Sequence, residues 1–137
     1  MTLAFSAPVT TSYRPVPLSL QAHQYRSAVA AGATAVDLRS TADRSAGGAL
    51  IGALAVDVDE ALDLLAPDSD RRLRAATADA RWLLISDDGY DAEMLAWHLQ
   101  ARGVRGAQFV VGGHAALRSA RVGGSIGDDA LGLFDTH

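Results

Sequence analysis

The stretch LLISDDGYDAEML, residues 83–95, joins three patterns that together decide the fold class. The run RWLLI that leads into the loop is almost entirely apolar, which is typical of a strand in a parallel sheet covered on both faces. Small and acidic residues follow it, and Leu95 and Leu99 then recur at helical spacing. The stretch therefore predicts a buried strand, a short loop and a helix from Asp91 to Arg102 that ends at Gly103.

The same alternation of strand and helix patterns continues through the rest of the chain. Apolar runs predict strands within TAVDLRS (34–40), near residues 54–58 and within AQFVV (107–111). Helical patterns cover residues 18–31, with Ser19 as the cap and Gly32 at the end, then DEALDLLAP (59–67) and the segment after the turn Gly112–Gly113. Strands that alternate with helices indicate an α/β fold with a central, mostly parallel sheet.

The bulk composition excludes several functional classes. The 137 residues suit one domain, and the net charge of -4 gives no electrostatic footprint for nucleic acid or an anionic membrane surface. The chain has no cysteine, which excludes disulfides, thiolate metal sites and thiol nucleophiles. No window approaches the ~18 apolar residues of a membrane span, and the start lacks the features of a signal peptide. We therefore expect a soluble, cytoplasmic protein without membrane partners.

Three segments differ in character. Residues 1–17 carry Ser, Thr and three prolines, which favour extended backbone and predict an N-terminal arm. Residues 18–121 hold the strand and helix patterns and form one predicted domain. Residues 122–137 contain four glycines and are expected to form a C-terminal tail.

Four motifs in order resemble the rhodanese-like family: VDLR (36–39), GALIGA (48–53), LLISDDGY (83–90) and ARGVRGAQFVVGGHAAL (101–117). In addition, APDSDRRL (66–73) is similar to a segment of an actinobacterial group within that family. The resemblance implies a three-layer fold in which helices flank a mostly parallel sheet. It also implies sulfur transfer, because active members carry a loop cysteine that takes up a sulfane sulfur as a persulfide and passes it to a thiol.

The family's catalytic cysteine falls on Ser86 in this chain. A serine hydroxyl ionises far too weakly to replace a thiolate and is a poor nucleophile towards sulfur. An activated serine would need a nearby base, for which His114, His98 and the loop acids are the candidates. Other family positions also differ, since Ala49, Ile51 and Leu117 stand where the motifs have His, Pro and Trp.

The loop after Ser86 carries the acids Asp87, Asp88, Asp91 and Glu93 without a basic residue among them. Two unit charges ~4 Å apart near a protein surface interact by about 4 kcal/mol, so this loop opposes an anionic donor such as thiosulfate. Three roles stay open for the acids: capping of the helix by Asp88 or Asp91, binding of a cation or basic partner, or binding of a divalent metal. We predict no metal and no cofactor.

Other residues support this loop. Asp37 and Arg39 end the first predicted strand, where a structural ion pair or a hydrogen bond to the loop is expected rather than a catalytic role. Gly89 and the turn before His114 are expected to supply backbone freedom, and His114 is the histidine expected near the same sheet edge. Tyr90 fits the core and the pocket rim equally well. Trp97 lies in the middle of its helix, where packing is the expected role and an interface with a partner is the alternative.

Three hypotheses follow. In the first, the chain is a catalytically degenerate rhodanese-like domain that acts in binding, scaffolding or regulation, with a protein or small-molecule partner that carries positive charge. In the second, it is an active thiosulfate or persulfide sulfurtransferase in which Ser86 replaces a native cysteine. In the third, Asp87, Asp88, Asp91 and His114 serve as acid–base groups of a changed chemistry. Monomer and homodimer both stay open.

Overall fold

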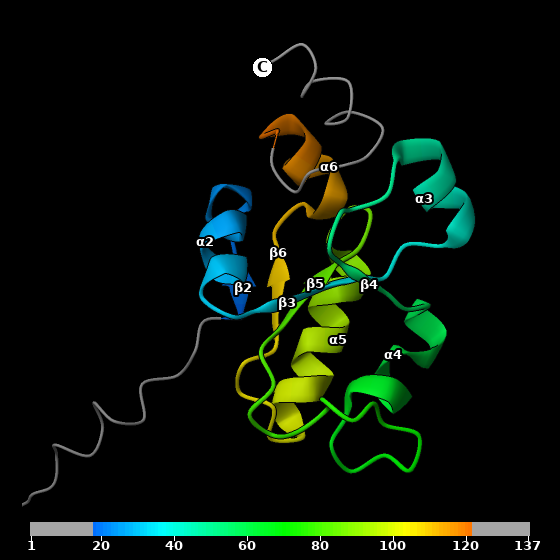
Figure 1. Cartoon of the computed structure of the whole chain (residues 1–137), viewed down its shortest axis with the longest axis vertical. Helices are drawn as coiled ribbons and strands as arrows, with labels where there is room; N and C mark the ends of the chain where they lie inside the picture. The colour runs from blue at the N-terminus through cyan, green and yellow to red at the C-terminus, as the bar shows by residue number, and fades with distance from the viewer. Residues whose placement is uncertain (1–17, 122–137) are drawn as a thin grey trace, which may run out of the picture.

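A computed structural model describes residues 18–121, and Figure 1 shows how their helices and strands are arranged. The strands are β2 (Ser19–Leu20), β3 (Thr34–Asp37), β4 (Leu54–Ala55), β5 (Trp82–Ile85) and β6 (Gln108–Val110). The helices are η1 (Ala22–Gln24), α2 (Tyr25–Ala30), α3 (Thr41–Gly47), α4 (Val58–Leu65), α5 (Tyr90–Ala101) and α6 (Gly113–Ser119).

The sheet has the strand order β2-β6-β5-β3-β4, and every pair of neighbours runs parallel. The apolar strand β5 lies at its centre, with Leu84 opposite Val36 of β3 on one side and Phe109 of β6 on the other. Because all strands point the same way, the loops that follow them gather at one edge. The predicted α/β fold with a mostly parallel sheet is confirmed.

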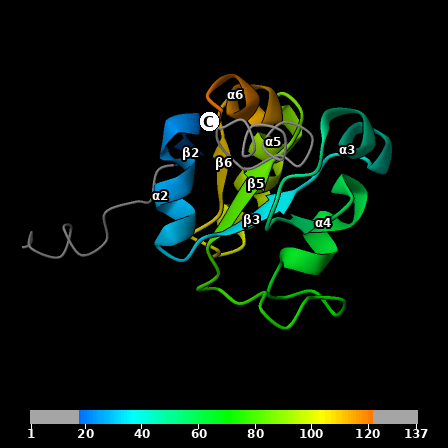
Figure 2. The ribbon, with the colours of Figure 1, turned by 45° about the horizontal axis from the view of Figure 1, so that its top comes forward.

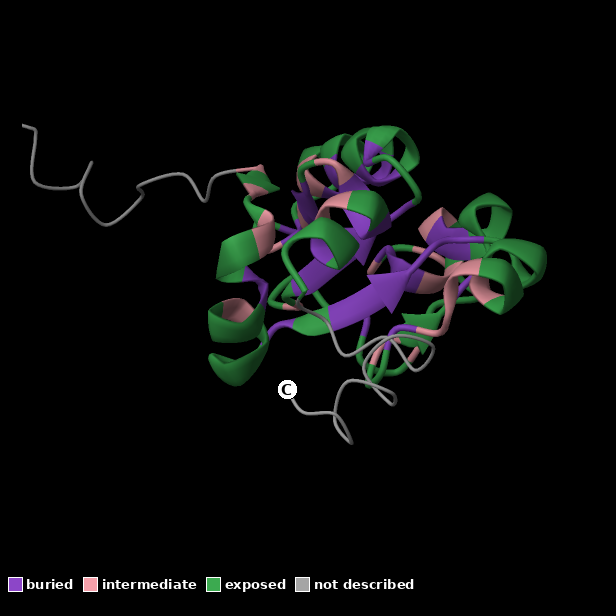
Figure 3. Ribbon diagram, turned by 90° about the horizontal axis from the view of Figure 1, so that it is seen from above, coloured by how far each residue is buried: buried purple, intermediate pink, exposed green. Residues whose placement is uncertain are grey.

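Helices cover both faces of this sheet, which makes three layers (Figure 2). Leu84 packs in a cluster with residues of α4 and α5, such as Leu65 and Leu99. Its neighbour Leu83 packs in the other cluster, with residues of α2 and α6. Successive strand residues point to opposite faces, so a strand covered on both sides is apolar throughout. Figure 3 shows the buried strands between helices whose outer faces are exposed.

The prediction of one helix over residues 18–31 is wrong in its first part. Ser19 and Leu20 form the edge strand β2, and the carbonyl of Leu18 accepts a hydrogen bond of 3.0 Å from the N–H of Phe109. Pairing with β6 therefore outweighs the local helical pattern, and Ser19 caps no helix. Helical structure begins only at η1, and the chain turns at Gly32, which has a positive φ of 110°.

Helix α3 was not predicted, because the segment reads as a glycine-rich turn. Its cap is Ser40, whose hydroxyl accepts a hydrogen bond of 3.0 Å from the N–H of Asp43.

The strand predicted near 54–58 is shorter than expected, since Val58 already opens α4. Within residues 18–121 no helix combines the length and apolarity needed to cross a bilayer. The predicted arm (1–17) and tail (122–137) lie outside the described residues.

The turn between β6 and α6 packs directly against the loop after β5. Gly112 and Gly113 have φ values of 77° and 59°, which glycine adopts readily. The N–H of His114 donates a hydrogen bond of 2.8 Å to the carbonyl of Ser86, and the N–H of Ala115 donates one of 3.2 Å to that of Asp87. This backbone contact sets the position of the loop.

We expect Gly113→Ala to destabilise the protein by about 3 kcal/mol or more, as measured by urea unfolding. A Cβ at this position would lie 2.1 Å from the Ser86 carbonyl oxygen and 2.7 Å from the Gly89 nitrogen, so the backbone of the loop would have to move. Gly103→Ala is the matched control, because its φ of +93° is also positive but no atom lies within 4 Å. Its expected cost is about 1 kcal/mol, from conformational strain alone. Equal costs would contradict a role for the close contact.

Candidate functional site

The predicted site residues meet where the carboxyl ends of the parallel strands lie. Arg39 follows β3, Ser86 follows β5 and His114 lies near the start of α6 after β6. In open α/β sheets, this edge is where ligands bind. The structure thus brings together Asp37, Arg39, the loop 86–91 and His114 from segments far apart in sequence.

Ser86 is buried, with 4% of its surface exposed, and its hydroxyl lies inside the loop. The Ser86 Oγ accepts hydrogen bonds from the backbone N–H groups of Gly89 (3.1 Å) and Ala92 (3.2 Å). Helix α5 begins one residue earlier than predicted, at Tyr90, and its N-cap residue is Gly89 with a left-handed φ of 96°. The two bonds therefore satisfy N–H groups at the start of α5 that would otherwise have no helical partner.

The N-cap residue is thus neither Asp88 nor Asp91, although the role of capping a free N–H at the start of α5 holds for Asp88. Asp88 Oδ1 does accept a hydrogen bond of 3.0 Å from the N–H of Tyr90, while Asp91 lies in the exposed first helical turn. Capping of α5 falls mainly to Ser86, which stands three residues before the N-cap. The glycine at the cap allows the backbone to turn back over that hydroxyl.

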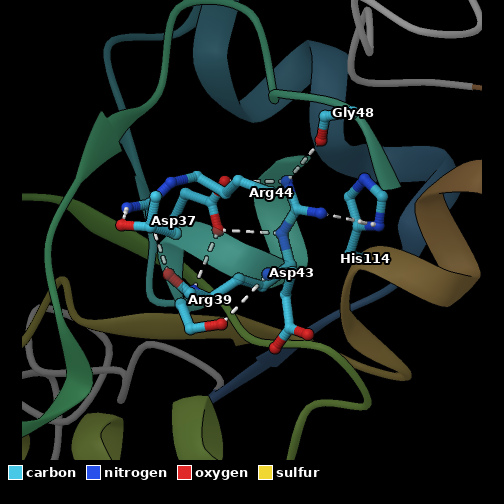
Figure 4. Close-up of polar contacts among 8 residues, drawn as sticks. Asp37, Arg39, Asp43, Arg44, Gly48 and His114 are labelled. Atoms are coloured by element: carbon cyan, nitrogen blue, oxygen red, sulfur yellow. Dashed lines mark hydrogen bonds and ion pairs between the residues drawn. The ribbon is translucent and has the colours of Figure 1, made fainter. Parts of the chain in front are cut away.

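Asp37 and Arg39 form a buried, bidentate ion pair, as Figure 4 shows. Arg39 Nε lies 3.0 Å from Asp37 Oδ1, and Nη2 lies 2.9 Å from Oδ2. Nη2 also donates to the carbonyl of Gly48 at 2.8 Å, and Nη1 lies 3.4 Å from Nδ1 of His114. The expected structural ion pair is present, and it links the end of β3 to the turn after α3 and to α6.

Asp87 faces Asp43 of α3 across the site. The pKa of the Asp87 carboxyl is raised, first by its partial removal from water and then by a hydrogen bond with the Asp43 carboxyl and by the charge of Asp43. The charge of Asp88 raises the pKa further, whereas Arg39 lowers it. Asp87 as a whole residue is exposed, so this pair lies at the surface of the site rather than in its core.

Two hollows flank the Asp43–Asp87 pair. The first, of about 600 Å³, lies between α3, the loop and α6, with charged lining residues Arg39, Asp43, Asp87, His114 and Arg118. The second, of about 380 Å³, lies between α3, the start of α4 and the start of α5. It is lined by Leu38, Arg39, Ser40, Asp43, Val58, Ser86, Asp87, Asp88, Tyr90 and Asp91.

The two hollows differ in charge. The first carries two aspartates and two arginines, with His114 between them. Among the described residues that line the second hollow, four are aspartates and Arg39 is the cation. The Arg39 charge is already balanced by Asp37 at 2.9 Å. The second hollow therefore favours a positively charged group.

Tyr90, Trp97 and His98, which the sequence also singled out, are all exposed. Tyr90 is 64% exposed and lies on the rim of the second hollow, which decides between the two roles left open for it. Trp97 is 63% exposed, so its expected packing in the interior is wrong and the alternative role at an interface stays open. His98 is exposed, away from Ser86 on α5. Within residues 18–121 no group of three or more His, Asp or Glu side chains is arranged to hold a metal ion.

Several residues that line the two hollows were not predicted as site residues, among them Ser40, Asp43 and Arg118. A local sequence pattern could have identified Ser40 and Asp43. The stretch STAD, residues 40–43, has the spacing of a helix cap followed by an acid three residues later. Recognition of that pattern would have predicted α3 at this position, but not its contact with the loop of Asp87.

We expect Arg39→Met to destabilise the protein by about 3–5 kcal/mol, because Asp37 would stay buried without its partner. Arg71→Met is the matched control, since the Arg71–Asp63 pair spans 3.4 Å but is exposed, and we expect less than about 0.5 kcal/mol. A double variant that also carries Asp37→Asn should recover part of the lost stability, because it removes the unpaired buried charge. Chemical unfolding measures all three, and a similar loss for Arg39→Met and Arg71→Met would contradict the structural role of the buried pair.

We expect Asp87→Asn to raise the melting temperature at pH 7. Because the folded-state pKa of Asp87 is raised, its contribution to stability is full below the ordinary value of 3.8 and is lost as the pH rises through the folded-state pKa. The gain should therefore shrink as the pH falls towards about 4. Asp79→Asn, at an exposed position outside both hollows, controls for the loss of a charge. A gain that does not change with pH would contradict this assignment.

Solved structures of other proteins share the fold of this chain. No family model and no curated protein matches the chain. A human single-domain sulfurtransferase is 19% identical and covers 76% of this chain and 97% of its own, with a TM-score of 0.62. A rhodanese-related protein from Thermoplasma volcanium is 17% identical, with 76% and 93% covered and a TM-score of 0.60.

A Rhodopseudomonas palustris protein of unknown function, described as a possible tyrosine phosphatase, is also similar in structure. It is 19% identical and covers 75% of this chain and 80% of its own, with a TM-score of 0.66. Likenesses at this level of identity establish the fold, and function has to be argued from the site. The chain has the rhodanese-like α/β fold that its motifs predict, in a variant without a loop cysteine.

Proposed function

We propose that residues 18–121 form a rhodanese-like domain that has no sulfur-transfer activity and serves to bind a partner that carries positive charge. One observation carries the proposal: the buried hydroxyl of Ser86 occupies the position of the family's cysteine and accepts two backbone hydrogen bonds within the loop. We also propose the cytoplasm as its location, since a chain without cysteine suits a reducing compartment.

The arrangement around Ser86 explains why the scaffold persists without the chemistry. Backbone N–H groups at a helix N-terminus stabilise an anion, and in a thiol enzyme they would lower the pKa of the cysteine. Here the N–H groups of Gly89 and Ala92 point at a neutral hydroxyl. That hydroxyl holds the loop in shape, but it cannot carry a sulfane sulfur.

The charges around the loop oppose the usual sulfur donor. An anion such as thiosulfate that approached Ser86 through the second hollow would meet Asp87, Asp88 and Asp91. At an effective dielectric of 20, a unit charge ~4 Å from one carboxylate is repelled by about 4 kcal/mol. An ammonium or guanidinium group would gain from the same field, so the partner we propose is cationic.

We expect Ser86→Cys to remain inactive in a thiosulfate-to-cyanide sulfur-transfer assay and to gain no sulfur atom by intact-protein mass spectrometry. Addition of Asp87→Asn and Asp91→Asn should allow the persulfide to form, since it removes two of the repelling charges.

Robust sulfur transfer by Ser86→Cys alone would overturn this proposal and support an active sulfurtransferase with a replaced nucleophile.

A second candidate function is acid–base catalysis, which the raised pKa of Asp87 beside Asp43 favours. Paired carboxyl groups that share a proton are a recurrent acid–base device. The test is incubation with a collection of cationic and neutral metabolites, followed by mass spectrometry for conversion that the wild type catalyses and Asp87→Asn does not. Absence of such conversion contradicts this candidate.

A further inference from the structure

The outer face of α5 carries an exposed row of large apolar side chains. Tyr90, Met94 and Trp97 are 64%, 45% and 63% exposed, and their spacing of four and three residues places them on one side of the helix. We call these three residues the α5 stripe. Single exposed apolar residues are ordinary on protein surfaces, whereas a contiguous row marks an interaction surface.

The α5 stripe does not belong to the core. The opposite side of α5 packs against the sheet and α4 through Ala92, Leu95, Ala96 and Leu99. A surface helix normally turns a polar face to water, but α5 is apolar on two sides. Packing within the domain accounts for the inner side and leaves the stripe for a partner.

The stripe continues into the second hollow. Tyr90 is both the first residue of the stripe and part of the lining of that hollow. Val58, at the start of α4, also lines it and is 38% exposed. An extended side chain that entered there would pass two apolar groups before it reached the aspartates of the hollow.

The charges around the stripe select the sign of the partner. Asp91 and Glu93 flank it on α5, Asp87 and Asp88 stand at its start, and all four are exposed. Asp59 and Glu60 add two more exposed acids in the first turn of α4. Such a rim attracts a basic partner and repels an acidic one.

We propose that the α5 stripe docks a basic, amphipathic peptide segment of a partner protein. A Lys or Arg of that segment enters the second hollow between Val58 and Tyr90 and meets the carboxylates of Asp87 and Asp91. Apolar side chains of the same segment pack against Met94 and Trp97. This inference deepens the proposed function, because it names the chemistry of the cationic partner and the surface that holds the rest of it.

A second copy of this chain fits the stripe less well than a basic peptide does. If two copies joined through their α5 stripes in a symmetric contact, the acids of both copies, Asp91 and Glu93 among them, would be brought into one interface. Like charges brought together in an interface cost several kcal/mol. The acidic rim therefore argues for a heterologous, basic partner.

The test is selection from a phage-displayed library of random peptides of about 16 residues on the immobilised full chain. Before each selection, the library is passed over an immobilised Tyr90→Ser/Trp97→Ser double variant, which removes peptides that bind outside the stripe. Both side chains are more than half exposed, so the double variant should melt within a few degrees of the wild type. Enriched peptides should combine Lys or Arg with Leu, Ile, Phe or Met.

Synthetic fluorescein-labelled copies of the enriched peptides then give affinities by fluorescence anisotropy. We expect Trp97→Ser to weaken binding about tenfold or more, as loss of an aromatic anchor does. The matched control is Val29→Ser on α2, at the other face of the sheet, where a 40% exposed apolar residue is replaced and binding should not change. Asp91→Asn/Glu93→Gln should weaken binding several-fold and reduce its dependence on salt between about 50 and 500 mM NaCl.

Several outcomes would overturn the inference. These are no enrichment relative to the double variant, enrichment of acidic peptides, or an equal effect of Val29→Ser and Trp97→Ser. Trp97→p-benzoylphenylalanine gives a further check, because photocrosslinking within the same chain or to a second copy would mean that the stripe is already covered. Sulfur transfer by Ser86→Cys would contradict the proposed function without affecting these results, so the two failures are distinguishable.

Discussion

The buried pair of Arg39 and Asp37 holds the site together. Its salt bridge of 2.9 Å has side chains that are 1% and 2% exposed, and such a pair is stable only when its remaining donors also have partners. The Gly48 carbonyl and the His114 ring supply these partners. The turn after α3 and the start of α6 are thereby positioned by one guanidinium. The same pairing leaves Arg39 with little charge to offset the carboxylates of Asp43 and Asp87.

The loop beside this pair owes its shape to backbone contacts. The Ser86 carbonyl accepts a hydrogen bond from the N–H of His114, and the Ser86 hydroxyl accepts two from the start of α5. Gly113 is so close to the Ser86 carbonyl that a side chain would not fit. None of these contacts needs a sulfur atom. The shape of the loop therefore does not depend on a cysteine at position 86.

Sequence patterns predicted the parts of the fold that depend on local apolar periodicity, and failed where distant contacts decide. The apolar run that ends at Ile85 predicted the central strand β5 and placed Ser86 directly after it. The apolar run before the glycine turn that precedes His114 predicted the neighbouring strand β6. The two-residue strand β2 exists only because β6 pairs with it, and α3 is hidden in a glycine-rich segment. Trp97 was assigned to packing because periodicity cannot tell which side of a helix faces the core when both sides are apolar. The contact between Asp43 and Asp87 joins α3 to the loop after β5, which no local pattern relates.

These observations separate what shapes the site from what sets its charge. The shape rests on buried or backbone groups, chiefly Arg39, Gly113 and the Ser86 hydroxyl. The charge rests on exposed side chains such as Asp88 and Asp91, which few packing constraints restrict. The gain or loss of one charge at an exposed position costs little stability, yet at ~4 Å it alters the energy of a bound ion by about 1 kcal/mol in water and about 4 kcal/mol at a dielectric of 20. The fold can therefore be shared with a sulfurtransferase while the charge around the hollows varies independently of it.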